Sequence, residues 1–162
     1  MKVIVDISDA KVSNSTNDVI ITYSLGSCIG VTLYDARIKA GGMLHYQLPS
    51  SKNEQRSTRN NPLMYADSGM DYMLDRLRAM GANMKRMSVK IAGGAQMLIA
   101  PGLSDRFNVG QRNVDMTQTA LAQHHIRVAG CDTGGTQGRT MRLFVATGEL
   151  KVRFVTGEII SL

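Results

Sequence analysis

The sequence predicts an α+β fold in which strands make up most of the structure. The chain has 162 residues, of which 43% are hydrophobic, so it is long enough for one domain with a substantial core. It contains 16 glycines but only 3 prolines, and turn residues recur along the whole chain. This composition favours many short elements over a bundle of long helices, and we expect residues 1–162 to form a single domain.

Apolar or alternating runs predict about eight strands. Because the loop at 147–149 contains a glycine that can adopt a positive φ, the last two strands are expected to form a hairpin. The second, third and fourth strands are expected to pair consecutively and antiparallel. The predicted strands span residues 3–7, 19–23, 29–34, 42–46, 87–91, 126–129, 141–146 and 150–155.

Two segments show helical periodicity instead. In the first, Asn61 can cap the helix, Pro62 suits its first position, and apolar residues recur at helical spacing until Gly81. The second spans residues 109–123, with Asn108 as its cap. The polar, aperiodic stretch at 50–61 predicts a surface loop.

Charge and hydropathy narrow the class of protein. The net charge is +6, but the basic residues are scattered and only 5% of residues are aromatic, so we expect no nucleic acid as partner. Asp6 interrupts the first apolar run, and no uncharged run approaches the roughly 20 residues that span a bilayer. We therefore expect a cytoplasmic protein without membrane insertion, in which Cys28 and Cys131 are free thiols.

The stretch TYSLGSCIG at residues 22–30 raises the question of catalysis. Free cysteines are often buried and structural, so composition alone leaves open whether Cys28 is inert or reactive. A catalytic cysteine needs a base, because a free thiol is mostly protonated at neutral pH. Histidine usually supplies that base, and the chain has His45, His124 and His125.

The expected strand pairing selects among these histidines. Three consecutive antiparallel strands would bring Thr22, Cys28 and His45 together, with Thr22 and His45 flanking the central strand on opposite sides. Whether Thr22 orients His45 or only lines the site stays open. The small residues Gly26 and Ser27 form a turn that can present backbone N–H groups to a developing oxyanion.

Other candidate residues have simpler explanations. We expect Cys131 to be structural, and the His124–His125 pair to end the second helix, where a positive imidazole suits the helix dipole. Their spacing matches no zinc motif, so we expect no metal. The glycine pairs at 93–94 and 134–135 match no phosphate-binding loop and predict tight turns.

Five blocks of sequence resemble, in this order, the motifs of the CheD family of chemoreceptor glutamine deamidases. They lie between Thr22 and Arg139 and read TYSLGSCIGVTLYD, GGMLHYQLP, KIAGGAQML, VGQRNV and DTGGTQGR. The resemblance implies Cys28 as nucleophile, His45 as base and Thr22 as the third member of the site. It also implies a β-sandwich flanked by helices, similar to the catalytic domain of cytotoxic necrotising factors.

The activity implied by the resemblance is hydrolysis of glutamine side chains to glutamate on methyl-accepting chemoreceptors, with no cofactor. Weak receptor methylesterase activity is a related expectation. The partners implied are the cytoplasmic helices of the receptors and, in some members, a CheC-type phosphatase. The alternative is a non-catalytic chemotaxis regulator that binds receptors or such a phosphatase through the same groove. Ala92 stands where family members commonly carry an aromatic residue, a departure that concerns local packing.

Overall fold

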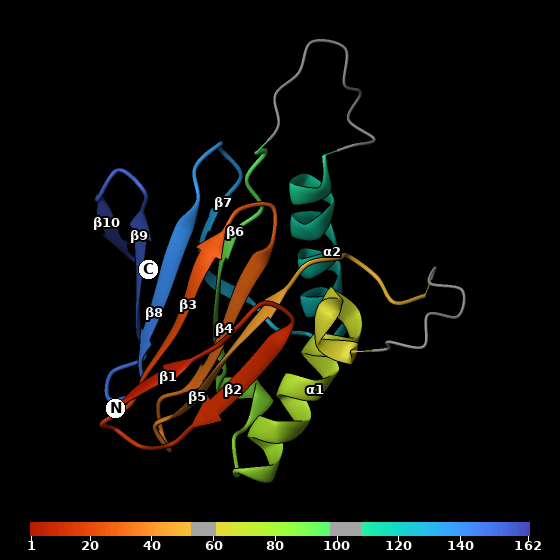
Figure 1. Cartoon of the computed structure of the whole chain (residues 1–162). Helices are drawn as coiled ribbons and strands as arrows, with labels where there is room; N and C mark the ends of the chain where they lie inside the picture. The colour runs from red at the N-terminus through yellow and green to blue at the C-terminus, as the bar shows by residue number, and fades with distance from the viewer. Residues whose placement is uncertain (53–60, 98–107) are drawn as a thin grey trace.

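A computed structural model of the chain describes residues 1–52, 61–97 and 108–162. Within these residues there are ten strands in two five-stranded sheets, two α-helices and two short 3-10 helices. The two sheets pack face to face, and both α-helices lie on one side of the pair (Figure 1). The expected α+β fold, a β-sandwich flanked by helices, is confirmed.

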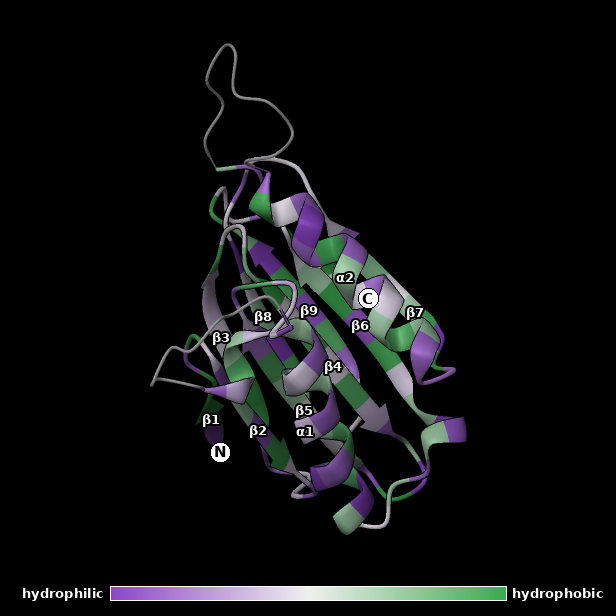
Figure 2. Cartoon of the chain, turned by 90° about the vertical axis from the view of Figure 1, so that its right-hand side faces the viewer, coloured by the Kyte–Doolittle hydropathy of each residue, from purple (hydrophilic) through white to green (hydrophobic). Residues whose placement is uncertain are grey.

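The helix-covered sheet has the strand order β2-β5-β4-β6-β7. Its central strand, β4, pairs antiparallel with β5 and with β6, while β6 and β7 are parallel. Figure 2 looks onto α1 and α2, which lie across these strands. The elements are β2 (Asp9–Ser13), β4 (Ile29–Asp35), β5 (Ala40–Tyr46), α1 (Ala66–Ala79), β6 (Ser88–Gly93), α2 (Val109–Gln123) and β7 (Val128–Thr133).

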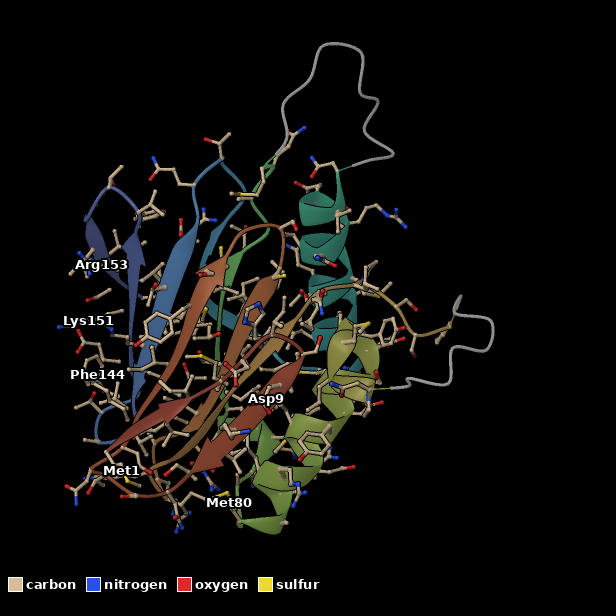
Figure 3. The ribbon with its side chains drawn as sticks, in the orientation of Figure 1. Met1, Asp9, Met80, Phe144, Lys151 and Arg153 are labelled. Carbon is tan, nitrogen blue, oxygen red and sulfur yellow. The ribbon has the colours of Figure 1, made fainter. Side chains whose placement is uncertain are left out.

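The open sheet has the order β1-β3-β8-β9-β10. Its outer face carries Phe144, Lys151 and Arg153, which Figure 3 shows on the side away from the helices. The ammonium of Lys151 lies 5.5 Å from the centre of the Phe144 ring. The expected hairpin of β8 and β9 is confirmed, with Gly148 at φ +74° in its loop. The strands are β1 (Lys2–Ile4), β3 (Val19–Leu25), β8 (Arg139–Phe144), β9 (Glu149–Phe154) and β10 (Ile159–Ser161).

Two apolar clusters hold these layers together. One lies between the helices and the helix-covered sheet and includes Ile29, Val31 and Leu33 of β4. The other lies between the two sheets and includes Met43 of β5 and Met141 of β8. Side chains of successive strand residues point to opposite faces, so β4 is buried on both sides along its whole length.

The expected pairing of residues 19–23 with residues 29–34 is wrong. These segments form β3 and β4, which belong to different sheets, and the short connection between them crosses from one sheet to the other. Both edges of β4 are occupied by β5 and β6, so β3 pairs with β1 and β8 instead. A short turn of small residues is compatible with a hairpin within one sheet and with a crossing between two sheets. The sequence therefore did not distinguish these two connections.

The predicted helices are confirmed with one correction. The second spans Val109–Gln123 as expected, and the Asn108 side chain accepts a hydrogen bond from the Gln111 N–H. The first is interrupted: Asn61 caps the 3-10 helix Pro62–Met64, and α1 begins at Ala66. Tyr65 between them is extended (φ −118°, ψ 148°) because its backbone forms a parallel bridge with Leu48.

None of the helices in the described ranges is long and apolar enough to cross a membrane.

The polar stretch at 50–61, expected to form a surface loop, is described only in part, because residues 53–60 lie outside the described residues. Its first part is fixed to the start of α1, since the backbone N–H of Ser51 donates to the Asp67 carboxylate at 3.0 Å.

The buried carboxylate of Asp35 at the end of β4 generates a stability prediction. Burial alone would raise the pKa of Asp35, but hydrogen bonds from Arg86 (2.7 Å) and the Asn83 N–H (2.9 Å) lower it below its usual value. Asp35→Asn should therefore lower the free energy of unfolding by about 2 kcal/mol at neutral pH, measured by urea denaturation.

The pH dependence checks the cause of that loss. A carboxylate with a lowered pKa contributes stability above its unfolded pKa, about 3.9, and loses it as the pH falls through the lower folded pKa. The difference between wild type and Asp35→Asn should therefore shrink below about pH 4. The control is Asp75→Asn, which removes an exposed ion pair with Arg78 and should cause no measurable change. A difference that stays constant to low pH would contradict the assignment.

Candidate active site

Cys28 lies in the short connection that crosses from β3 to β4. Three consecutive carbonyls of this connection are held by hydrogen bonds. The Gly26 and Cys28 carbonyls accept from the backbone N–H groups of Ala95 and Gly94, both at 2.9 Å. The Ser27 carbonyl accepts from the side-chain amide of Asn113 at 2.9 Å. The backbone on which the thiol sits is therefore fixed.

The glycine pair at residues 93–94 supports this connection directly, although the tight turn predicted there does not form, since Gly93 is the last residue of β6 and Gly94 follows it without a turn. Gly93 and Gly94 have φ angles of +114° and +67°, a region that favours glycine. A Cβ atom added at Gly93 would lie 2.2 Å from the Cys28 carbonyl oxygen, which is backbone and cannot move aside. Glycine is required here because the two backbones approach so closely.

The register of β4 and β5 places Cys28 and His45 on one face of the helix-covered sheet. His45 lies opposite Gly30, which has no side chain, and Cys28 is two residues before Gly30. Residues two apart in an extended chain point to the same face. Cys28 also packs against the cluster between the sheets, whose members include Met43, two residues before His45. The expected convergence of the two side chains is therefore supported by the pairing of β4 and β5.

Thr22 reaches the same place from the other sheet. The register of β3 shifts between Thr22 and Leu25, and this irregularity leaves both side chains fully buried while Tyr23 and Ser24 between them are exposed. The Thr22 hydroxyl oxygen lies 2.8 Å from His45 Nδ1. Thr22 thus contacts His45 across the sandwich, and the expectation that the two residues flank one central strand is wrong.

The hydrogen bonds of Thr22 determine which nitrogen of His45 carries the proton. The Thr22 hydroxyl donates to the Val5 carbonyl at 2.8 Å, and a carbonyl can only accept. A hydroxyl has one proton, so its oxygen must accept from His45, and Nδ1 carries the hydrogen. Nε2 is then an unprotonated acceptor. It is buried and has no hydrogen-bond partner among the described residues, which leaves its lone pair available.

Burial keeps both candidate catalytic groups uncharged. Desolvation raises the pKa of the Cys28 thiol, and the residue's own backbone N–H offsets this only in part. Desolvation also lowers the pKa of His45 to about 4, against a weaker opposing effect of the Asp6 carboxylate. At neutral pH the pair is therefore a thiol and a neutral imidazole, with a base at Nε2.

The bonded carbonyls of Gly26 and Ser27 constrain the directions of the N–H groups that follow them. In a trans peptide the carbonyl and the N–H point in opposite directions. Since the Gly26 and Ser27 carbonyls are directed at Ala95 and Asn113, the N–H groups of Ser27 and Cys28 point away from those residues. Two adjacent donors in a fixed backbone have the form of an oxyanion-binding turn.

The remaining cysteine and histidines lie apart from this arrangement. Cys131 is an exposed residue of β7, and neither thiol forms a disulfide. His124 ends α2 as predicted, and its Nε2 lies 2.9 Å from the Asp71 carboxylate of α1. His125 follows with φ +55°. These two residues therefore belong to the helix end, as the sequence indicated.

One residue near the site was missed by sequence reasoning. Asn113 lies in the middle of α2, where an asparagine reads as an ordinary polar residue on a helix, yet it is fully buried. Asn113 lies in the block VGQRNV, which indicated the family resemblance but was given no site role, and the signal that could have singled it out is its position on the buried face of α2, between Gly110 and Val114.

Comparison with known proteins identifies the family of the chain. A family model described as CheD chemotactic sensory transduction matches residues 47–154, about two thirds of the sequence. The chain belongs to the CheD family. A relative from Syntrophus aciditrophicus, named probable chemoreceptor glutamine deamidase CheD 1, is 39% identical over 160 residues, or 99% of this chain and 98% of its own length.

Two further relatives have similar identity to this chain. One from Thermococcus kodakarensis is 38% identical over 99% of this chain and 98% of its own length. Another from Desulforamulus reducens is 41% identical over 93% of this chain and 89% of its own. Both are named probable chemoreceptor glutamine deamidase CheD. The coverage includes residues 22–45, which hold Thr22, Cys28 and His45 and lie before the match to the family model begins at residue 47.

The lowered pKa of His45 predicts a specific dependence of stability on pH. In the unfolded chain His45 takes up a proton near its usual pKa of about 6.5, while in the folded protein it stays neutral until about pH 4. Unfolding is therefore favoured as the pH falls through this interval. Between about pH 7 and pH 4 the wild type should lose about 3 kcal/mol more unfolding free energy than His45→Gln, whose side chain does not titrate. Equal pH dependence in the two proteins, measured by urea denaturation, would contradict the burial of a neutral imidazole.

Proposed function

We propose that this protein hydrolyses side-chain amides of glutamine residues on chemoreceptors, giving glutamate and ammonia. The observation that carries the proposal is the hydrogen bond from His45 to Thr22, which leaves the lone pair of Nε2 free on the face of the sheet that carries Cys28. The names of the relatives supply the substrate class, because each is called a chemoreceptor glutamine deamidase. An enzyme acting on the cytoplasmic helices of receptors works in the cytoplasm. Binding of a CheC-type phosphatase as a further partner remains a prediction.

In the first half of the proposed reaction, the Cys28 sulfur attacks the carbonyl carbon of the glutamine carboxamide. His45 Nε2 takes the thiol proton as the C–S bond forms, and the C=O electron pair moves onto oxygen. The N–H groups of Ser27 and Cys28 are placed to hold this oxyanion, with Gly26 giving the turn its shape. As the carbonyl reforms, the C–N bond breaks and the imidazolium gives its proton to the nitrogen. Ammonia departs, and a thioester between Cys28 and the substrate remains.

In the second half, water replaces the sulfur. Neutral His45 takes a proton from water while the oxygen attacks the thioester carbon. The C–S bond then breaks, the imidazolium returns its proton to the Cys28 thiolate, and the product is glutamate. All atoms are accounted for by the amide, one water molecule and the two side chains.

The lowered pKa of His45 favours the second proton transfer, from the imidazolium to the departing nitrogen. A threonine hydroxyl orients the ring without adding a negative charge, so the imidazolium is not stabilised as it would be by an aspartate. An imidazolium with a pKa of about 4 is a stronger acid than an ordinary histidine and donates readily to the departing nitrogen. The base is also in its active neutral form throughout the physiological pH range.

Loss of the thiol should abolish the reaction. Cys28→Ala, incubated with a cytoplasmic fragment of a methyl-accepting chemoreceptor, should release no ammonia above background, and mass spectrometry should show no gain of one mass unit per modified glutamine. The matched control is Cys131→Ala, which removes the other thiol and should keep the wild-type rate. Unchanged release by Cys28→Ala would sink the assignment, and a wild type that binds the fragment without releasing ammonia would support the non-catalytic regulator instead.

Thr22 should act through the hydrogen at Nδ1. Thr22→Val keeps the shape of the side chain but removes the acceptor, so the ring can take the wrong tautomer or rotate. We expect kcat to fall on the order of tenfold to a hundredfold with KM little changed, less than the loss caused by removing a charged orienting group. Thr22→Ser retains the hydroxyl and should restore most of the rate. Equal rates for the valine and serine variants would show that Thr22 only lines the site.

A further inference from the structure

The side chain of Asn113 joins two segments that are far apart in the sequence. Its Nδ2 donates to the Ser27 carbonyl at 2.9 Å and to the Gln47 carbonyl at 2.7 Å. A primary amide nitrogen has two hydrogens, and both are used. One buried amide of α2 therefore holds two backbone segments of the helix-covered sheet at once.

Each of the two carbonyls lies next to a candidate catalytic residue. The Ser27 carbonyl belongs to the peptide bond that leads into Cys28, so its direction sets that of the Cys28 N–H. Gln47 follows His45 by two residues, at the end of β5. A shift of either carbonyl would move the thiol or the imidazole, and the shared nitrogen fixes the spacing between the two segments.

The helix that carries Asn113 is seated firmly against the same region. Gly110 lies one helical turn before Asn113. A Cβ atom added at Gly110 would lie 2.5 Å from the Gly94 carbonyl oxygen, so the helix backbone contacts the Gly93–Gly94 segment that supports Cys28. The Asn113 backbone carbonyl accepts hydrogen bonds from the Thr117 hydroxyl at 2.7 Å and the Tyr46 hydroxyl at 3.1 Å. The side-chain amide is therefore presented from a fixed backbone.

The other end of the Asn113 side chain argues against a purely structural role. Its Oδ1 is buried and has no hydrogen-bond partner among the described residues. Buried polar atoms are nearly always paired, because an unpaired one costs stability. Neither aspartate nor threonine could replace the amide, since neither offers two hydrogens from one atom. The two hydrogen bonds of the nitrogen must therefore offset the cost of the unpaired oxygen.

We infer that Asn113 is a positioning residue, which sets the geometry between the Cys28 nucleophile and the His45 base by holding the backbone beside each. The inference rests on the proposed function for its catalytic consequence. The reactivity of Cys28 toward a small electrophile reports the same geometry without any receptor, so the two can be tested separately.

The test uses the full chain in a Cys131→Ala background, where Cys28 is the only thiol. Iodoacetamide alkylation is followed by mass spectrometry at about pH 7.5, a little above the usual pKa of histidine. Asn113→Ala should slow alkylation on the order of tenfold or more, because His45 no longer meets the thiol in the productive geometry. The matched control is Thr119→Val, which removes the same kind of hydroxyl-to-carbonyl hydrogen bond from α2, to Asp115 instead of Asn113, and should stay within about twofold of the parent.

The pH dependence of alkylation in Asn113→Asp distinguishes a positioning role from a simple loss of stability. The ionised carboxyl has no hydrogen to donate, whereas its protonated form can donate one. The gap in alkylation rate between parent and Asn113→Asp should therefore narrow as the pH is lowered from about 8 to about 5.5, since burial beside two carbonyls raises the pKa of the introduced acid. The gap for Asn113→Ala should not narrow.

The same variants separate the inference from the proposed function. In ammonia release from the receptor fragment, Asn113→Ala should lower kcat with little effect on KM. Alkylation by a folded Asn113→Ala at the parent rate, or an equal loss in Thr119→Val, would overturn the positioning role. If alkylation depends on Asn113 but the wild type releases no ammonia, the proposed function fails and the positioning role stands.

Discussion

The hydrogen bond between Thr22 and His45 joins the two sheets of the sandwich, and the chemistry of the site depends on it. His45 lies on β5 of the helix-covered sheet, while Thr22 lies on β3 of the open sheet. The Val5 carbonyl takes the hydroxyl proton and so makes Thr22 an acceptor toward the ring. The segments that carry Val5, Thr22 and His45 must all be in place before Nε2 of His45 is left unprotonated. Packing of the two sheets thus determines which nitrogen of His45 carries the proton.

Because that interaction is neutral, the resting site carries no ion pair. Many cysteine enzymes hold a thiolate beside a charged histidine, and such a thiolate is prone to oxidation. Here burial keeps the Cys28 proton on sulfur and the His45 ring uncharged. In the proposed reaction, the nucleophile therefore forms only as the proton moves to Nε2 during attack. A reaction of this kind relies on accurate geometry between the thiol and the imidazole.

The sequence predicts most elements of this fold and the identity of the candidate residues, but not how the sheets divide. The alternation at 29–34 and 42–46 fixed the pairing of β4 with β5 and hence the shared face of Cys28 and His45. Strand β2 was missed because only Ala10 and Val12 carry its apolar face, and β10 because it has three residues. The division into sheets depends on which strands occupy both edges of β4, a long-range property that no local pattern contains. Asn113 escaped notice for the same reason, since its partners are 86 and 66 residues away in sequence.

The pairing of β3 also links activity to the order in which the chain can fold. Residues 2–46 supply Thr22, Cys28 and His45, yet β3 is held between β1 and β8, and β8 begins only at Arg139. Contacts between residues so distant in sequence close late, because a long loop must be ordered before they form. A nascent chain that has completed only its first strands would carry the nucleophile without a correctly oriented base. If the proposed site is the active one, the topology therefore delays its assembly until synthesis has passed the segment that completes the open sheet.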